Sequence, residues 1–419
     1  MTSKPLALLA ALVASVAVLA IAVGAAFAGS TAPPPAGEPT IPGVEYASGL
    51  GAPYLPTTGA DRKLSGFSMG PLGGKLQADA TKAGAAAGKA AGKVQFKRLT
   101  VGYLDIIGGI QSADRAHNAL RIAFRNIGVI DPNWVYCDGA GDPAKWNTCG
   151  QSLIAQGIDL LTLTGIDPSS IPSVVQGAKA KNIPIINFGG TVGPGYAASL
   201  APNEKLKGQI LAKYLAAKLG SAGGKILLID YPAPWAQDRS TQLTALVGST
   251  PALKIVSKKT TNPADLVAGT QKDVSDVLTA NPDIKAVWVD FDVAGAVAGG
   301  AIAQKFAGKK FPDRPLLVTF HADPSTQDLI KSGAIDVVVE NNWDATAWEV
   351  ADAAAQFFFA KKPWPKYSVS VNYPGLGDPL TYQIVTSKNL PKQARKYVAP
   401  AKDAVSYFIA KWRAQGITQ

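Results

Sequence analysis

From Phe96 onward, short apolar runs alternate with stretches of helical periodicity, and this alternation constrains the fold more than any other feature of the chain. Such an alternation predicts βαβ units, and therefore parallel strands covered by helices. We expect strands at 99–104, 133–136, 160–163, 183–187, 225–229, 254–257, 286–289, 316–320 and 334–339. Helical spacing of apolar residues is clear between them at 114–126, 172–180 and 206–219.

Two sheets explain this series better than one, because 419 residues exceed what a single hydrophobic core usually organises. An internal similarity supports the division. Residues 155–164, a helix and the strand at 183–188 have the same layout as residues 280–289, a helix and the strand at 316–320. The sequence therefore predicts an α/β protein with a first lobe at 96–200, a second at 201–339, and a return to the first near Glu340.

The first 95 residues lie outside this pattern. Lys4, an apolar run over 6–27 and Ala26-Phe27-Ala28 form the three parts of a signal peptide, which we place at 1–28. The remainder is expected in the periplasm or cell envelope, and the same apolar run would anchor the chain if it were not cleaved. Residues 29–95 are rich in Pro, Gly and Ala, and this composition predicts a tether.

Cysteine content and charge exclude several classes of protein. Cys137 and Cys149 are the two cysteines, and export predicts a disulfide between them, although a free pair remains open. Two Cys and two His are too few for a structural zinc site, and no cofactor is expected. The net charge of +11 comes from scattered lysines, which together with export argues against a nucleic-acid partner. We expect a monomer.

Candidate binding residues follow the predicted strands, because ligands of open α/β sheets bind beyond the carboxyl ends of the strands. Polar groups mixed with aromatic rings at these positions suit a small polar ligand. The aspartates among them would also be explained as helix caps. The candidates are Asp105, Asp138, Thr164, Gly189, Trp235, Arg239, Phe291, Asp292, His321 and Glu340.

An enzyme is the rival hypothesis. Asp290 and Asp292 form a D-x-D motif at a strand end, which in glycosyltransferases holds a metal and a nucleotide-sugar, but no further acidic cluster accompanies it. His117 and His321 are the two imidazoles, and neither stands in a catalytic-triad order. The sequence therefore favours binding without catalysis, with His321 in the pocket because it directly follows a strand.

Several motifs in a fixed order resemble a known family. They are Gly141-Asp-Pro-Ala-Lys145, Leu153-Ile-Ala-Gln-Gly-Ile-Asp159, Asn182-Ile-Pro-Ile185, 211–219, Asp238-Arg239, Asn281-Pro-Asp-Ile-Lys-Ala-Val287 and Phe320-His-Ala-Asp-Pro324. From about Leu99 to Trp364, the chain resembles the type I periplasmic substrate-binding proteins, the ribose- and sugar-binding kind related to the effector domains of LacI repressors. The export signal, and the lack of a DNA-binding headpiece, favour the transport branch.

The resemblance implies two Rossmann-like lobes with parallel sheets, joined by a hinge, that close on a ligand. The N-terminal lobe would comprise 96–200 plus 340–366, and the C-terminal lobe 201–339. Residues 367–419 resemble the hinge-crossing strand and final helix of the family. The closed form would be presented to the permease of an ABC transporter, so the protein would meet the membrane only there or through an uncleaved signal.

The resemblance also assigns roles to two residues. Arg239 matches the arginine that clamps sugar oxygens, and Asp292 matches the aspartate of an Asn-Asp pair. The chain departs from the family at Phe291, His321, Glu340 and Gly189, where Asn, Asp, Gln and Asp are usual.

These departures leave the ligand open. Trp235 and Phe291 would stack on a sugar face or an aromatic ring. Asp292 and Glu340 would also suit an amine. We expect an exported protein that captures a sugar or sugar-like molecule for an ABC importer, with an envelope-anchored sensor as the alternative.

Overall fold

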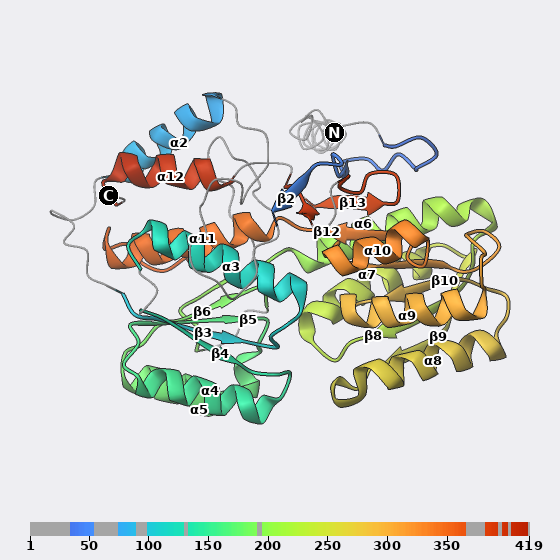
Figure 1. Ribbon diagram of the computed structural model, residues 1–419, viewed down its shortest axis with the longest axis horizontal. Coiled ribbons are helices and arrows are strands. Elements are labelled where there is room, and N and C mark those ends of the chain that lie inside the picture. The colour runs from blue at the N-terminus through green and yellow to red at the C-terminus, as the bar shows by residue number, and fades with distance from the viewer. Residues whose placement is uncertain are drawn as a thin grey trace, which may run out of the picture.

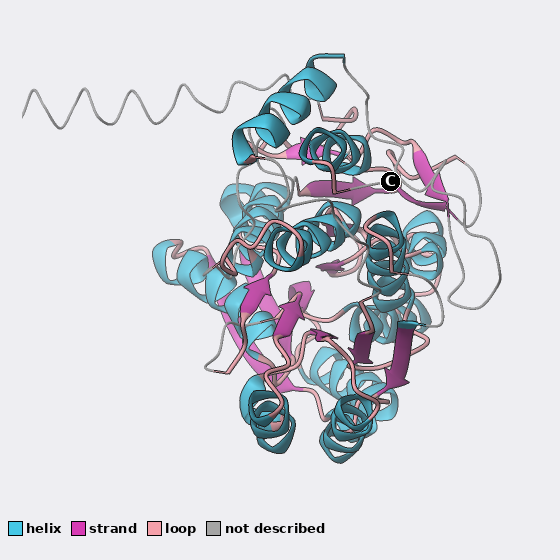
Figure 2. Cartoon of the chain, turned by 90° about the vertical axis from the view of Figure 1, so that its left-hand side faces the viewer, coloured by secondary structure: helices cyan, strands magenta, loops and turns pink. Residues whose placement is uncertain are grey.

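The computed structural model describes residues 34–53, 74–88, 99–129, 133–190, 195–365, 382–392, 396–400 and 404–417. The predicted signal peptide, residues 1–28, lies outside these ranges. None of the helices within them is long and apolar enough to cross a bilayer. The described chain forms two α/β lobes, each built on its own sheet with helices on both faces (Figure 1, Figure 2), and the predicted fold class is thereby confirmed.

The N-terminal lobe contains a five-stranded parallel sheet in the order β4-β3-β5-β6-β7. Its strands are β3 (Val101–Asp105), β4 (Trp134–Asp138), β5 (Leu160–Thr164), β6 (Ile185–Phe188) and β7 (Ala198–Leu200). Its helices are α3 (Gln111–Asn126), α4 (Pro143–Ala155), α5 (Pro172–Ala180), α11 (Trp343–Phe358) and α12 (Ala404–Gln415). Helices α4 and α5 cover one face of the sheet, and α3 and α11 cover the other (Figure 1).

The C-terminal lobe contains a seven-stranded sheet in the order β1-β13-β12-β11-β10-β8-β9. Its strands are β8 (Gly224–Asp230), β9 (Leu253–Thr260), β10 (Ile284–Val289), β11 (Leu316–Phe320), β12 (Val337–Glu340), β13 (Gln383–Thr386) and β1 (Glu45–Tyr46). Its helices are α6 (Glu204–Leu219), α7 (Pro234–Ser249), α8 (Leu266–Ala280), α9 (Asp292–Lys305) and α10 (Pro324–Ser332). Strand β13 is antiparallel to β12, whereas the other pairs are parallel.

Each sheet buries both faces, which explains why its strands are continuous apolar runs. In β3, Val101 and Tyr103 pack with α3 and α11, whereas Leu104 faces α4 and α5. In β10, Trp288 packs towards α6, and Val287 and Val289 pack towards α8 and α9. The alternation of side chains along each strand thus supplies two helix-covered cores per lobe.

The interpretation of residues 29–95 as a tether needs correction for 34–53 and 74–88. Ile41, Val44 and Tyr46 are buried in the C-terminal lobe, and β1 pairs with β13. Helix α2 (Gly74–Ala87) packs on α12 (Figure 1). The average composition of the segment conceals these few apolar residues, which another part of the chain buries.

A short two-stranded sheet lies where the lobes meet. Strand β2 (Gly51–Pro53) pairs antiparallel with β14 (Lys396–Val398). The Tyr397 hydroxyl donates to the carbonyl of Gln111 in α3 at 2.7 Å, and Gln327 Nε2 of α10 donates to the carbonyl of Lys396 at 2.7 Å. Strand β14 therefore contacts both lobes.

Candidate functional site

The carboxyl edges of the two sheets meet through the helices that follow them. Helix α3 follows β3 in the N-terminal lobe, and α9 follows β10 in the C-terminal lobe. The Ser112 hydroxyl of α3 donates to Asp292 Oδ2 of α9 at 2.8 Å. The backbone N–H and hydroxyl of Ser325, in α10, both donate to Gln111 Oε1 at 2.9 Å. These bonds join the lobes at the edges where ligands of α/β sheets bind.

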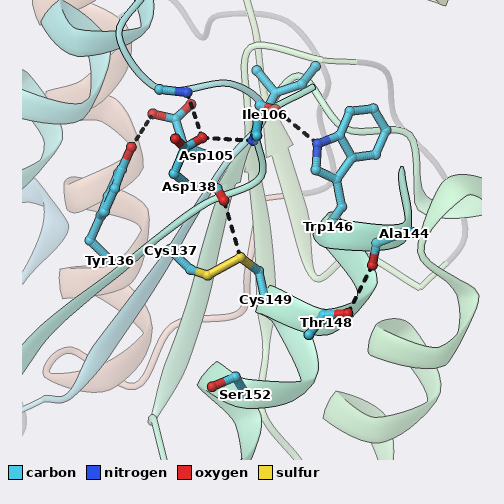
Figure 3. Close-up of a disulfide and its surroundings, with 12 residues drawn as sticks. Asp105, Ile106, Tyr136, Cys137, Asp138, Ala144, Trp146, Thr148, Cys149 and Ser152 are labelled. Atoms are coloured by element: carbon cyan, nitrogen blue, oxygen red, sulfur yellow. Dashed lines mark hydrogen bonds between the residues drawn. A yellow bond between two sulfur atoms is a disulfide. The ribbon is translucent and has the colours of Figure 1, made fainter. Parts of the chain in front are cut away.

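A disulfide fixes the N-terminal side of this region. Cys137 of β4 and Cys149 of α4 are bonded, as expected, with their Cα atoms 5.7 Å apart (Figure 3). In the same helix, Trp146 Nε1 donates to the carbonyl of Ile106 at 2.9 Å. Helix α4 is thus attached both to the edge strand and to the loop that follows β3.

Asp138 organises that loop. Its Oδ1 accepts hydrogen bonds from the backbone N–H groups of Gly108 and Ala140, both at 2.7 Å. A Cβ at Gly108 would lie 2.8 Å from Asp138 Oδ2 and from the Tyr136 hydroxyl, so a larger residue would displace the loop. Asp138 therefore has a structural role in shaping the edge of the site.

Asp105 ends β3 and is fully buried. Its Oδ2 accepts a hydrogen bond from the Tyr136 hydroxyl at 3.2 Å, whereas Oδ1 has no partner among the residues that the structure describes (Figure 3). Burial, reinforced by the nearby Asp138 carboxylate, raises the pKa of Asp105 to about 7. Near neutral pH this carboxyl is therefore present in both its donor and its acceptor forms.

The ends of β5 and β6 offer little free polar surface. The hydroxyls of Thr164 and Tyr103 are hydrogen-bonded to each other at 2.5 Å. Gly189 has a φ of +83°, and a Cβ there would lie 3.3 Å from Cζ3 of Trp343 and 3.9 Å from Cγ2 of Thr164. The glycine permits both the left-handed backbone and the close approach of the indole.

Trp343, which the sequence did not single out, lies between the lobes. Its ring contacts Phe188 of β6 edge-on at 5.8 Å and His321 of the C-terminal lobe at 5.4 Å between centroids. The side chain is buried, and within the described ranges its Nε1 has no acceptor. The available signal was its position three residues after Glu340, at the beginning of a helix.

Arg239 is held rigidly in the C-terminal lobe. Its Nε donates to Glu204 Oε2 and its Nη1 donates to the carbonyl of Asp290, both at 2.6 Å. The guanidinium also lies 4.9 Å from the ring centroid of Trp235 and 4.3 Å from that of Phe320. These contacts leave some of its five N–H groups for another acceptor.

A buried ion pair on α6 supports this arginine. Glu204 lies 3.1 Å from Lys207, and although burial raises the pKa of Glu204, Arg239 and Lys207 outweigh it and lower the pKa to about 2. Burial lowers the pKa of Lys207 to about 8. Lys207 Nζ donates to Asn341 Oδ1 at 3.0 Å, and Asn341 Nδ2 has no acceptor in the described part of the chain. Charges three residues apart on a helix usually lie on its surface, so local spacing alone does not place this pair inside.

His321 and Glu340 are in contact. His321 has a φ of +64°, its Nδ1 lies 3.5 Å from Glu340 Oε1, and its Nε2 lies 3.4 Å from Arg239 Nη2. Burial and the nearby Lys207 lower the pKa of His321, whereas Glu340 opposes this shift. The backbone N–H of Ala322 donates to Glu340 Oε2 at 2.6 Å; burial opposes ionisation, but this bond and His321 help to lower the pKa of Glu340 to about 2.

The D-x-D motif does not form one site. Asp290 Oδ1 accepts from Trp288 Nε1 at 2.6 Å, and burial together with the carboxyl of Asp230 raises the pKa of Asp290 well above its ordinary value. Asp292 accepts from the backbone N–H of Val293 and from Ser112 in the opposite lobe. The described residues contain no cluster of three or more His, Cys, Asp and Glu side chains suited to a metal.

Three aromatic rings line the C-terminal side. Tyr231, Trp235 and Phe291 contact one another, with centroids separated by 4.9–5.7 Å. All three side chains are partly exposed. They form an apolar surface beside Arg239.

The structure gathers the ten candidate residues into connected groups. Arg239, His321, Glu340, Trp235 and Phe291 form one group in the C-terminal lobe. In the N-terminal lobe, Asp105 lies beside Asp138, and Thr164 lies beside Gly189 (Figure 3). Asp292 links the lobes through Ser112.

Comparison with known proteins identifies relatives. Residues 129–362, more than half of the chain, match the periplasmic binding protein domain. The chain is 24% identical over 231 residues to the ribose import binding protein RbsB of Bacillus subtilis (strain 168). The aligned region covers 54% of this chain and 72% of that protein.

Two solved structures illustrate the likeness in fold. One is an ABC transporter solute binding protein from Mycobacterium smegmatis with bound glycerol, with a TM-score of 0.60, 22% identity, and coverage of 71% of this chain and 99% of that one. The other is the periplasmic binding protein component of the arabinose ABC transporter from Shewanella sp. ANA-3, with a TM-score of 0.57, 18% identity, and coverage of 69% and 92%. The chain belongs to the periplasmic binding protein family, whose members bind their ligands and are not enzymes.

Proposed function

We propose that this protein captures a single sugar molecule between its lobes and delivers it to an ABC importer. RbsB is named as a ribose import protein, and the two solved relatives are described with glycerol and with arabinofuranose. Sugars and polyols are thus the ligand class of the relatives, and importers are their partners.

The observation that carries the proposal is a set of buried polar atoms at or just beyond the carboxyl ends of β3 and β12 that lack hydrogen-bond partners within the described ranges. They are Asp105 Oδ1, Asn341 Nδ2 and Trp343 Nε1. Each unsatisfied group costs about 1–3 kcal/mol, so a ligand that satisfied them would gain this energy. Every hydroxyl both donates and accepts, and a polyhydroxyl ligand is therefore suited to a mixture of donors and acceptors.

The remaining side chains are consistent with a sugar ring. Arg239 is fixed by Glu204, and its free N–H groups suit ring or hydroxyl oxygens. Tyr231, Trp235 and Phe291 provide a surface on which the C–H face of a sugar packs. A ligand that contacts both lobes at once favours the closed form, which is the form that a permease would recognise.

A thermal-shift screen of the purified protein tests the proposal. We expect D-ribose, L-arabinose or a related monosaccharide, without added metal, to raise the melting temperature by about 5 °C at a hundredfold excess over Kd. Arg239→Ala should lose this shift. Arg413→Ala, which removes an exposed arginine of α12, should keep it.

Two results of the screen would contradict sugar capture. If no sugar or polyol stabilises the protein, or if stabilisation requires a divalent metal together with a nucleotide-sugar, capture of a free sugar is the wrong function.

A further inference from the structure

Trp343 lies against the ends of β5 and β6 in the N-terminal lobe. At the ends of β5 and β6, the Thr164 hydroxyl already bonds to Tyr103, and Gly189 has no side chain. The indole lies against Gly189, where an added Cβ would come within 3.3 Å of Cζ3. This side of the site is therefore defined by the tryptophan.

The same ring also contacts the C-terminal lobe. It lies 5.4 Å from His321, which is in turn 3.4 Å from Arg239 Nη2. His321 thus lies in contact both with Trp343 and with Arg239, the arginine that we expect to bind sugar oxygens. Its Nε1 is buried and has no acceptor among the described residues, although buried indole N–H groups usually have one.

We propose that Trp343 determines specificity in two ways. Its ring closes the site beside β6 and limits the ligand to a single sugar ring, and its Nε1–H donates to one oxygen of that ligand. Asn341, two residues earlier, offers a second unsatisfied donor from the same turn of chain. This inference rests on the proposed function and extends it to the size of the ligand and to one of its contacts.

Two substitutions separate the two roles. Trp343→Phe keeps an aromatic ring but lacks the N–H group, and should weaken binding of the monosaccharide found in the screen about fivefold. Trp343→Ala opens the space beside Gly189. It should weaken that monosaccharide about tenfold or more and allow maltose or lactose to bind, neither of which should bind the wild type.

Trp348 provides a matched control. It lies one and a half turns further along α11, is fully buried, stacks on Trp412 at 5.2 Å, and also has an Nε1 without an acceptor in the described ranges. Trp348→Phe removes the same N–H group away from the site, so affinity for the monosaccharide should not change. Isothermal titration calorimetry measures all four proteins, and circular dichroism checks that each is folded.

Three results would contradict a role of Trp343 in specificity. Unchanged affinity in Trp343→Phe, no disaccharide binding in Trp343→Ala, or an equal loss in Trp348→Phe would overturn the inference while leaving sugar capture intact. If the wild type binds no sugar and Trp343→Ala gains none, the proposed function fails and the inference fails with it.

Discussion

At the strand ends of the five-stranded sheet, buried polar side chains bond to tyrosine hydroxyls, whereas beside the strand ends of the seven-stranded sheet a carboxylate pairs with two buried cations. Asp105 bonds to Tyr136, and Thr164 bonds to Tyr103. In the C-terminal lobe, Glu204 bonds to Arg239 and to Lys207. The buried charges of the N-terminal lobe, Arg115 and Asp344, pair with each other between α3 and α11 at 3.0 Å, away from Asp105 and Thr164.

This difference indicates that the strand ends of the two lobes differ in rigidity. A network of buried charges is rigid, because displacing one member leaves another unpaired in a medium of low dielectric constant. The C-terminal edge is therefore preorganised, and the N-terminal edge approaches it with glycines and a loop that Asp138 holds in place. Substitutions should consequently have unequal effects on the two edges.

The largest effect is expected at the charged edge. Glu204→Ala leaves Arg239 and Lys207 buried without their counterion, and should lower the free energy of unfolding by about 3–5 kcal/mol. Urea denaturation measures this change. Lys205→Ala is the control, because its pair with Asp238 is long, at 3.8 Å, and exposed, and its loss should cost about 0.5 kcal/mol or less.

A similar, small effect of the two substitutions would mean that the network does not stabilise the C-terminal edge. The contrast between the edges would then have no energetic basis.

The next effect is expected at Asp105, at the end of β3, and depends on pH. Asp105 has a folded pKa of about 7, above its ordinary value, so its ionisation destabilises the folded state in full above pH 7 and not at all below about pH 4. Asp105→Asn removes this penalty. The variant should be more stable than the wild type at pH 8, on the order of 2–4 kcal/mol, and equally stable at pH 4.

Thermal melts of both proteins between pH 4 and pH 8 provide the measurement. A stability difference that is the same at both ends would show that Asp105 ionises normally, and that the two edges resemble each other in charge.

A smaller effect is expected where Trp343 meets Gly189. Gly189→Ala places a side chain on a backbone with a φ of +83° and against the indole, which should cost about 1–2 kcal/mol and weaken ligand binding. Gly300→Ala, in α9, meets no atom within 4 Å and should stabilise the protein by up to about 1 kcal/mol. Melting temperatures that fall in both variants would refute the close approach.

The smallest effect is expected for the bond that links the edges. Ser112→Ala removes the hydrogen bond to Asp292, which should destabilise the closed form by about 1 kcal/mol and weaken ligand binding about fivefold. Small-angle X-ray scattering of the ligand-free protein should show a larger radius of gyration. Ser152→Ala, at an exposed position of α4, should change neither property, and an equal change in both would exclude an interlobe role for Ser112.

The sequence predicted the elements whose periodicity is local. All nine expected strands are present, and α5 and β11 have the expected bounds. Strand β7 (Ala198–Leu200) was missed because its three residues are too few to show a pattern. Strand β1 was missed because only its pairing with β13, distant in sequence, makes it a strand.

The site was predicted in part for a related reason. Reading the residues at strand ends found His321 and Glu340, because strand ends are recognisable from local pattern. Arg239 lies on α7, and its match to the arginine of the resembled family supported its choice. Glu204 and Trp343 lie on helices, where the sequence does not distinguish a residue that faces the opposite lobe from one in a core or on a surface. Their roles follow from tertiary contacts alone.

The pairing of β1 with β13 has a consequence for synthesis. Glu45 aligns with Gln383, so β1, which is synthesised early, can pair only after β13 is synthesised near the end of translation. Until β13 arrives, the apolar side chains of Ile41 and Tyr46 have no lobe to cover them, and joining such distant segments is a slow step in folding. Once formed, β1 caps the edge of the seven-stranded sheet, and the newly folded chain loses a strand edge on which other copies would aggregate.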